Sequence, residues 1–129
     1  MDKRIRAGNV AIKRAYERAA GKDGRRILID RLWPRGVGKA DAAIELWMKD
    51  IAPSTALRQW FGHEPARWPE FRRRYAAEVR KRPGELAQLR AFAREGPITL
   101  IYGAHDQRHN DAVALRDFVL GRWPANGAS

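Results

Sequence analysis

Arg25-Arg26-Ile27-Leu28-Ile29-Asp30-Arg31-Leu32-Trp33-Pro34-Arg35-Gly36 is the most informative stretch of this sequence. Its Ile-Leu-Ile centre is a continuous apolar run, which is typical of a strand that is buried on both faces of a parallel sheet. The run ends abruptly in an aspartate, two arginines, a tryptophan, a proline and a glycine. We therefore predict a central strand over residues 25–30 that delivers polar side chains to one edge of a sheet.

Two further stretches predict strands. Ile98-Thr99-Leu100-Ile101-Tyr102 is the stronger one, and it stops at Gly103-Ala104-His105-Asp106. Asn9-Val10-Ala11-Ile12-Lys13 alternates weakly between apolar and polar residues, which indicates a first strand near the start of the chain.

Four amphipathic stretches predict helices. The first begins after Ser54, which is placed as its N-cap, and ends at Gly62. Apolar residues at helical spacing define the other three, over residues 68–79, 85–95 and about 108–120. Between the central strand and the first helix, residues 34–41 predict a loop, and residues 44–51 predict an ordered loop or a short helix.

This order of elements predicts an α/β fold: one small domain with a mainly parallel β-sheet of three or four strands covered by helices. The helical stretch between the two strong strands is long enough for a crossover connection. We place the ordered core at about residues 9–120, between a basic N-terminal arm (1–8) and a flexible tail (122–129). The length fits one domain with its own hydrophobic core.

The composition excludes several classes of function. The chain has no cysteine, which rules out disulfides, thiolate metal sites and thiol chemistry. No apolar segment approaches the roughly 20 residues that span a bilayer, and no signal peptide is evident, so we expect a cytoplasmic protein without a membrane partner. The formal net charge of +11 attracts nucleic acids and anionic metabolites, although genome-wide arginine enrichment gives the same composition.

The two loops that follow the apolar strands predict a binding site, because ligands of open parallel sheets bind beyond the carboxyl ends of the strands. If the two strands are neighbours, these loops face each other. Arg31 and Arg35 are candidate ligands for a phosphate or a carboxylate, since a guanidinium group matches both. The N-terminus of the last helix, near residues 107–111, would add backbone N–H donors.

Two residues of these loops are candidate catalytic groups. Asp30 is placed as a general base or as the group that orients an arginine, and His105 is a candidate because histidine is the side-chain type that most often serves in proton transfer. The other candidate ligand-binding residues share the same loops and the helix start behind them: Trp33, Gly36, Tyr102, Asp106 and Asn110.

Each of these assignments has a structural alternative. Asp30 could pair with Arg31 or Arg35 simply to lock the loop. Trp33 followed by a proline is common as a packing wedge, and His105 could be an ordinary surface histidine. The sequence therefore locates a site and leaves open whether a reaction takes place there.

We predict neither a metal nor a cofactor. His63, His105 and His109 lack the spacing of a zinc signature. Ser54 has a capping role and no glycine-flanked elbow around it, so nucleophilic catalysis has no candidate. The glycines at positions 36 and 38 do not form a phosphate-binding P-loop.

The sequence resembles the YeaO-like family of small bacterial proteins over about residues 9–120. The resemblance rests on three long strings: Arg26-Ile27-Leu28-Ile29-Asp30-Arg31-Leu32-Trp33-Pro34-Arg35-Gly36, Trp47-Met48-Lys49-Asp50-Ile51-Ala52-Pro53-Ser54, and Leu57-Arg58-Gln59-Trp60-Phe61-Gly62-His63. It implies a compact α/β domain in the bacterial cytoplasm, and it supplies no established reaction. Gly103 and His105 depart from the alanine and the basic residue that are usual in the family.

Three functions follow as hypotheses. The first is a site for a small molecule that carries a phosphate or a carboxylate. The second is a nucleic-acid-binding accessory protein that uses the arginine-rich surface. The third is a protein-interaction module that docks through the Trp33 loop, which would require an exposed indole.

Overall fold

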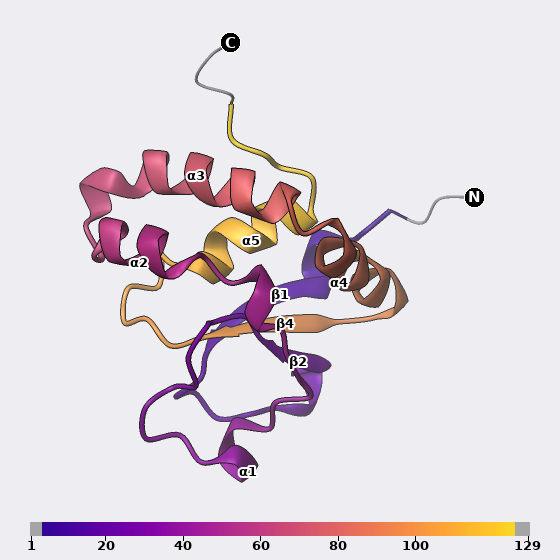
Figure 1. Ribbon diagram of the computed structural model, residues 1–129. Helices are drawn as coiled ribbons and strands as arrows, with labels where there is room; N and C mark the ends of the chain where they lie inside the picture. Colours follow the sequence, from indigo (N-terminus) through magenta and orange to yellow (C-terminus); the bar gives the residue numbers. More distant parts are fainter. Residues whose placement is uncertain (1–3, 126–129) are drawn as a thin grey trace.

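The computed structural model describes residues 4–125, and its centre is a four-stranded sheet (Figure 1). The strands are β1 (Val10–Arg14), β2 (Arg25–Leu28), β3 (Leu46–Trp47) and β4 (Ile98–Tyr102), in the spatial order β1-β4-β2-β3. Every neighbouring pair is parallel. The two strongest strand predictions are therefore confirmed as the two inner strands, β2 and β4, which lie side by side.

Five α-helices accompany the sheet in the described part of the chain: α1 (Lys39–Ala42), α2 (Thr55–Phe61), α3 (Trp68–Arg80), α4 (Pro83–Glu95) and α5 (Asp111–Val119). Short 3-10 helices occur at Ala7–Asn9, Gly21–Asp23, Lys49–Ile51 and Pro65–Arg67. Figure 1 shows α2 to α5 on one face of the sheet and α1 on the other. The chain is a small α/β domain, as predicted.

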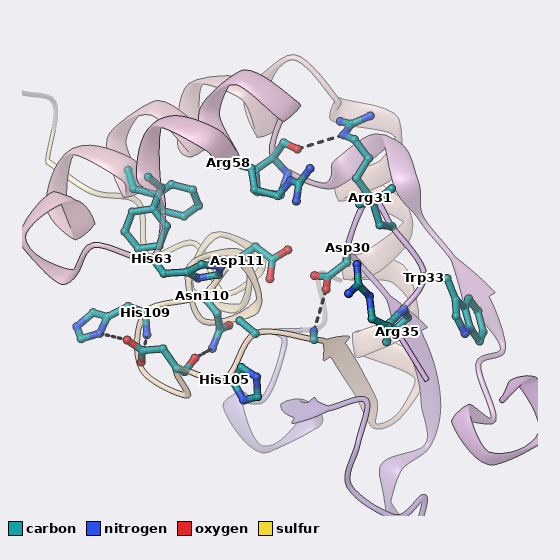
Figure 2. Close-up of a pocket in the computed structure, with 18 of the residues that line it drawn as sticks. Asp30, Arg31, Trp33, Arg35, Arg58, His63, His105, His109, Asn110 and Asp111 are labelled. Carbon is teal, nitrogen blue, oxygen red and sulfur yellow. Dashed lines mark hydrogen bonds and ion pairs between the residues drawn. The ribbon is translucent and has the colours of Figure 1, made fainter. Parts of the chain in front are cut away.

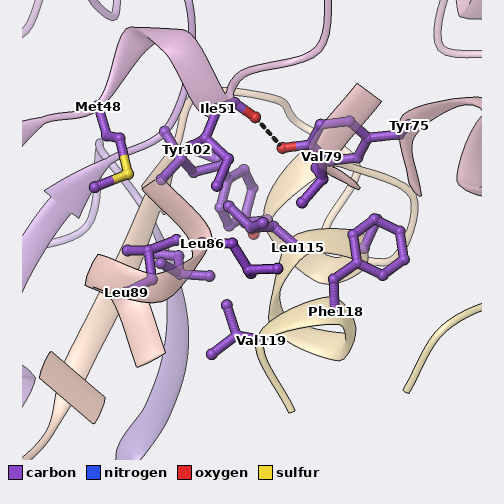
Figure 3. Packing of buried hydrophobic residues seen from close by; sticks show 14 of the residues in the cluster. Met48, Ile51, Tyr75, Val79, Leu86, Leu89, Tyr102, Leu115, Phe118 and Val119 are labelled. Atoms are coloured by element: carbon purple, nitrogen blue, oxygen red, sulfur yellow. Dashed lines mark hydrogen bonds between the residues drawn. The ribbon is translucent and has the colours of Figure 1, made fainter. Parts of the chain in front are cut away.

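The inner strands are buried on both faces, and this is why their sequences are continuously apolar. Ile27, Leu28 and Ile29 are all fully buried. Ile27 and Ile29 face the main core, where the helices supply Tyr75, Leu89, Leu115 and Phe118 among others (Figure 3). Leu28 faces the opposite way and packs in a smaller cluster with Ile101 and Ala15.

The smaller cluster is covered by the loop after β2 rather than by a long helix. Trp33, Val37, Ile44 and Trp47 pack onto it. Trp33 and Trp47 meet edge to face, with ring centroids 5.5 Å apart. Helices α2 to α5 thus cover one face, and α1 lies on the other, where Trp33 of the loop and Trp47 of β3 supply much of the apolar area.

The helix ends follow the predicted capping chemistry. The Ser54 hydroxyl accepts a hydrogen bond from Leu57 N at 3.1 Å, and Gly62 ends α2 in the left-handed conformation, with φ 54°. The last helix starts at Asp111, later than predicted, because the Asn110 side chain caps it by accepting from Val113 N. Helix α4 starts at Pro83, earlier than predicted, since proline fits the first turn of a helix.

One segment differs from its prediction. Residues 44–51 contain the short strand β3, which adds to the outer edge of β2, followed by a 3-10 helix. At the start of the predicted flexible tail, Trp123 stacks on Phe118 with ring centroids 4.8 Å apart. Residues 126–129 of the predicted tail, and residues 1–3 of the predicted arm, lie outside the described residues.

A buried ion pair ties the start of β2 to the turn before it. Arg26 Nη1 lies 2.6 Å from Asp23 Oδ2, and both side chains are about 5% exposed. Lys13 Nζ of β1 lies 3.1 Å from the same carboxylate. Burial alone would raise the pKa of Asp23, but the hydrogen bonds from Ala20 N, Lys13 and Arg26 outweigh it and lower the pKa.

Candidate functional site

A cavity of about 670 Å³ opens at the carboxyl edge of the sheet (Figure 2). It is lined by the loop after β2, the loop after β4, the start of α5 and parts of α2 and α3. Seven of the nine predicted site residues line it: Asp30, Arg31, Trp33, Arg35, His105, Asp106 and Asn110. The two loops face each other because β2 and β4 are parallel neighbours.

Asp30 connects the two loops. Its Oδ2 atom accepts a hydrogen bond from the backbone N–H of Gly103 at 2.8 Å. Asp30 forms no ion pair with Arg31 or Arg35, so the predicted loop-locking ion pair is absent from the described residues. Its carboxylate is instead directed toward the cavity and toward Asp111 (Figure 2).

Asp111 is one of two functional candidates that the sequence prediction did not include. It occupies the first turn of α5 and lines the cavity, and its carboxyl group faces that of Asp30 (Figure 2). Burial, followed by the charge and the hydrogen bond of Asp30, raises the pKa of Asp111 well above its ordinary value. The raised pKa favours the protonated, uncharged form of the Asp111 carboxyl.

The arginines around the cavity fall into two kinds. Arg31 is anchored, since its guanidinium donates to the carbonyls of Pro53 at 3.2 Å and Ala52 at 3.3 Å. Arg35 and Arg58 are exposed, line the cavity, and have no side-chain partner within residues 4–125. Arg58 comes from α2 and was not among the predicted site residues.

Asp106 and Asn110 organise the loop that precedes α5. Asp106 Oδ1 accepts from the backbone N–H groups of Arg108 at 2.8 Å and His109 at 3.0 Å. The N–H of Arg108, followed by the side chain of His109, lowers the pKa of Asp106. Asn110 donates to the Asp106 carbonyl and caps α5. Arg108 N–H and His109 N–H, two of the donors near residues 107–111 that were expected to bind an anion, are therefore already bonded.

Tyr102 and Gly36 do not line the cavity. Tyr102 is 3% exposed and belongs to the main core, and its burial, ahead of other effects, raises the pKa of its hydroxyl. Trp33 touches the cavity, but its indole packs on the sheet and donates to the Val37 carbonyl at 2.7 Å. Leu32, which is 61% exposed, is the apolar side chain that this loop presents to solvent.

Each of the three histidines lies beside a different residue. His105 is exposed, and its Nδ1 atom lies 3.4 Å from Arg14 Nη2. His109 Nδ1 lies 2.9 Å from Asp106 Oδ2, while His63 packs beside Phe61. Across residues 4–125 no group of three potential metal-ligating side chains comes together. No helix in the same part of the chain is long and apolar enough to cross a membrane.

The fold and the site define a small parallel α/β domain with a cavity of mixed apolar and charged lining beyond the carboxyl ends of its inner strands. The chain belongs to a family described as the "Inactive DUF488-N3 subclade", whose model matches residues 9–128.

Its relatives include the uncharacterized protein YeaO of Escherichia coli K12, which is 42% identical over 111 residues, covering 86% of this chain and 96% of YeaO. The uncharacterized protein Rv3073c of Mycobacterium tuberculosis H37Rv is 36% identical over 118 residues, covering 92% of this chain and 99% of that protein. The resemblance to the YeaO-like family is thereby confirmed. No solved structure matches the chain significantly.

Proposed function

We propose that this protein binds a small anionic molecule, one that carries a phosphate or a carboxylate, in the cavity at the carboxyl edge of the sheet. The observation that carries the proposal is the pair of unpartnered arginines, Arg35 and Arg58. Both line the cavity, and neither has a side-chain partner in the part of the chain that the structure describes.

The more buried arginines differ from this pair, because their guanidinium groups are used within the protein. Arg26 is paired with Asp23, Arg90 donates to the carbonyls of Val119 and Phe118, and Arg116 donates to Val10 O. A guanidinium group binds phosphate or carboxylate through charge-assisted hydrogen bonds, which are about twice as strong as neutral ones. Two such groups at one cavity therefore favour an anionic ligand.

The family description favours binding rather than turnover, since it names an inactive subclade. No catalytic step is needed to account for the arrangement. In this interpretation, Asp30 and Gly103 hold the two strand-end loops together, and Arg31 fixes the segment that leads into α2. The ligand would then enter a cavity whose walls are already formed.

The net charge of +11 favours a second candidate, nucleic-acid binding. The basic run of α3 supports it weakly, because Glu70 pairs with Arg73 and Arg74, and Asp117 pairs with Arg72. Docking of a protein partner through Trp33 has less support, since the indole N–H is bonded within its own loop.

Titration calorimetry with inorganic phosphate, pyrophosphate and citrate tests the proposal. Arg58→Ala and Arg35→Ala should each weaken binding about tenfold or more, the loss expected for one charge-assisted hydrogen bond. Arg73→Ala is the matched control, because it removes one exposed arginine that lies outside the cavity. Equal affinity in all four proteins would refute the proposal, and binding only to polynucleotides, with steep salt dependence, would favour the second candidate.

A further inference from the structure

We propose that the anionic ligand has an apolar body, and that this body packs on Leu32 and Tyr16 at the mouth of the cavity. The ligand class is an amphipathic acid, that is, a hydrocarbon that carries a phosphate or a carboxylate. This inference rests on the proposed function and specifies the ligand class of the same site.

The apolar side chains that the protein leaves exposed gather at this cavity. Within residues 4–125, two large apolar side chains are exposed, Leu32 at 61% and Tyr16 at 48%, and both line the cavity. They come from different loops, since Tyr16 follows β1 and Leu32 follows β2. A single exposed leucine needs no explanation, but two such residues that the fold brings to one cavity indicate a surface that a ligand covers.

Each unpartnered arginine has an apolar lining residue close to it in the chain. Arg58 and Phe61 lie three residues apart on α2, so they share one side of the helix, and both line the cavity. Arg35 and Leu32 lie three residues apart in the loop after β2, and both also line it. Positive charge and apolar surface therefore occur together on two walls, which favours a ligand that has both an anionic and an apolar part.

The ring of Tyr16 is held in place by the protein. Its hydroxyl donates to the Arg35 carbonyl at 2.9 Å, and the guanidinium carbon of Arg14 lies 4.8 Å from the ring centroid. Arg14 is itself fixed, because its Nε atom donates to the Ala104 carbonyl at 2.8 Å. A side chain that is already ordered loses little conformational freedom when a ligand covers it, so Tyr16 suits a binding surface.

The apolar lining continues from the exposed mouth into the buried wall. Phe61 and Phe71 line the cavity from α2 and α3, and both are buried, with their rings stacked 4.5 Å apart between centroids. Pro34 and Pro53 also line it and are buried. An apolar body that covers Leu32 and Tyr16 would therefore meet further apolar surface as it enters.

The test measures how affinity changes with the length of an alkyl chain on a constant anionic group. Titration calorimetry with methyl, butyl and hexyl phosphate, at two temperatures, gives the affinity and the heat-capacity change of binding. We expect the affinity to rise about twofold to fourfold per methylene, as burial of hydrocarbon requires. The heat-capacity change should become more negative with chain length, because it reports the apolar surface buried.

Three variants separate the apolar surface from the anion site. Leu32→Asn, at an exposed position and of nearly the same size, should reduce the gain per methylene to less than about twofold. Leu32→Met keeps an apolar side chain there and should restore the gain. Arg58→Ala should weaken binding of all three esters by the same factor, so that the gain per methylene is kept.

The outcomes distinguish this inference from the proposed function. Equal affinities for the three esters, each weakened in Arg58→Ala, would overturn the inference and leave the anion site in place. A gain per methylene that is unchanged in Leu32→Asn would also overturn it, as would tighter binding of ribose 5-phosphate than of butyl phosphate.

Two further results would overturn the proposed function and, with it, this inference. One is binding of 1-hexanol or hexylammonium as tight as that of hexyl phosphate, because the site would then have no preference for an anion. The other is the absence of binding by all three esters.

Discussion

The Asp30 carboxylate and the Gly103 backbone N–H, 2.8 Å apart, join the carboxyl ends of the two inner strands. Gly103 suits this junction, because a Cβ atom at that position would lie 3.3 Å from Asp30 Oδ2. The same carboxylate faces Asp111 at the start of α5 (Figure 2). Asp30 thus joins the ends of β2 and β4 and lies beside the start of α5, at the edge of the sheet where the cavity lies.

The negative charge of Asp30 contributes to the raised pKa of Asp111. Asp30→Asn removes the negative charge beside Asp111 and keeps an oxygen that accepts from Gly103 N. We expect the pKa of Asp111 to fall toward its ordinary value, although burial will still hold it above that value. Titration of the Asp111 carboxyl carbon by NMR measures the change. Asp41→Asn, at an exposed position of α1, is the control, and an unchanged Asp111 pKa in Asp30→Asn would contradict the coupling.

Asp111 also makes stability depend on pH with a definite sign. Its folded-state pKa is raised, so its stabilising effect is complete below the ordinary aspartate pKa and is lost as the pH rises through the folded-state pKa. The Asp111→Asn variant does not lose stability in this way as the pH rises. Its free energy of unfolding, relative to the wild type, should therefore increase between about pH 3 and pH 7. Urea unfolding at both pH values tests this, with Asp117→Asn on the same helix as control, and a difference that stays flat with pH would argue against a buried acid.

The two arginines of the predicted site should differ when each is replaced by alanine. Arg31→Ala removes two hydrogen bonds to the carbonyls of Pro53 and Ala52, and we expect a loss of about 2 kcal/mol in the free energy of unfolding. Arg35→Ala removes an exposed, unpartnered side chain and should change the free energy of unfolding by less than about 0.5 kcal/mol. Chemical denaturation of both variants provides the comparison, and equal losses would show that Arg35 also has a structural role.

The sheet could be predicted from sequence because its determinants are local. Ile27-Leu28-Ile29 and Ile98–Tyr102 are buried on both faces, and a continuous apolar run reports this directly. Ser54 and Gly62 likewise signal the ends of α2 within a few residues of their own positions. The sequence leaves open whether the two strands are neighbours, and the sheet order β1-β4-β2-β3 shows that they are.

The detailed chemistry of the site depends on long-range contacts that no local pattern encodes. Asp111 matters because α5 begins beside the end of β2, and the only sequence signal was its place directly after the capping Asn110. Arg31 and Arg35 are equivalent in the sequence, yet only Arg31 reaches the carbonyls at residues 52–53. The cover of the second sheet face by Trp33 and Trp47 is likewise a tertiary feature.

The buried Asp23 carboxylate should be among the most sensitive positions of the domain. Asp23→Ala leaves Arg26 buried without its counter-ion, and we expect a loss of about 3 kcal/mol in the free energy of unfolding. The folded-state pKa of Asp23 is lowered, so its contribution is present above the ordinary aspartate pKa and is lost as the pH falls through the folded-state value.

A comparison of Asp23 with an exposed carboxylate tests this prediction. Glu70 also pairs with two arginines, but all three side chains are at least 40% exposed, so Glu70→Ala should cost less than about 1 kcal/mol. Thermal and urea unfolding near neutral pH measure both variants. Similar losses for Asp23→Ala and Glu70→Ala would mean that the buried pair contributes no more than a surface one.

Tyr75 fixes the segment that precedes α2 from within the core. Its ring is fully buried, and its hydroxyl donates to the Ile51 carbonyl at 2.7 Å (Figure 3). Tyr75→Phe keeps the ring packing and leaves that carbonyl without its partner, so we expect a loss of about 1 to 2 kcal/mol. Tyr16→Phe is the matched control, because its hydroxyl bonds to the Arg35 carbonyl at an exposed site where water can replace it. A loss for Tyr16→Phe as large as that for Tyr75→Phe would show that burial does not set the strength of these bonds. It would also mean that the Tyr16 hydroxyl stabilises the loop that lines the cavity at Arg35.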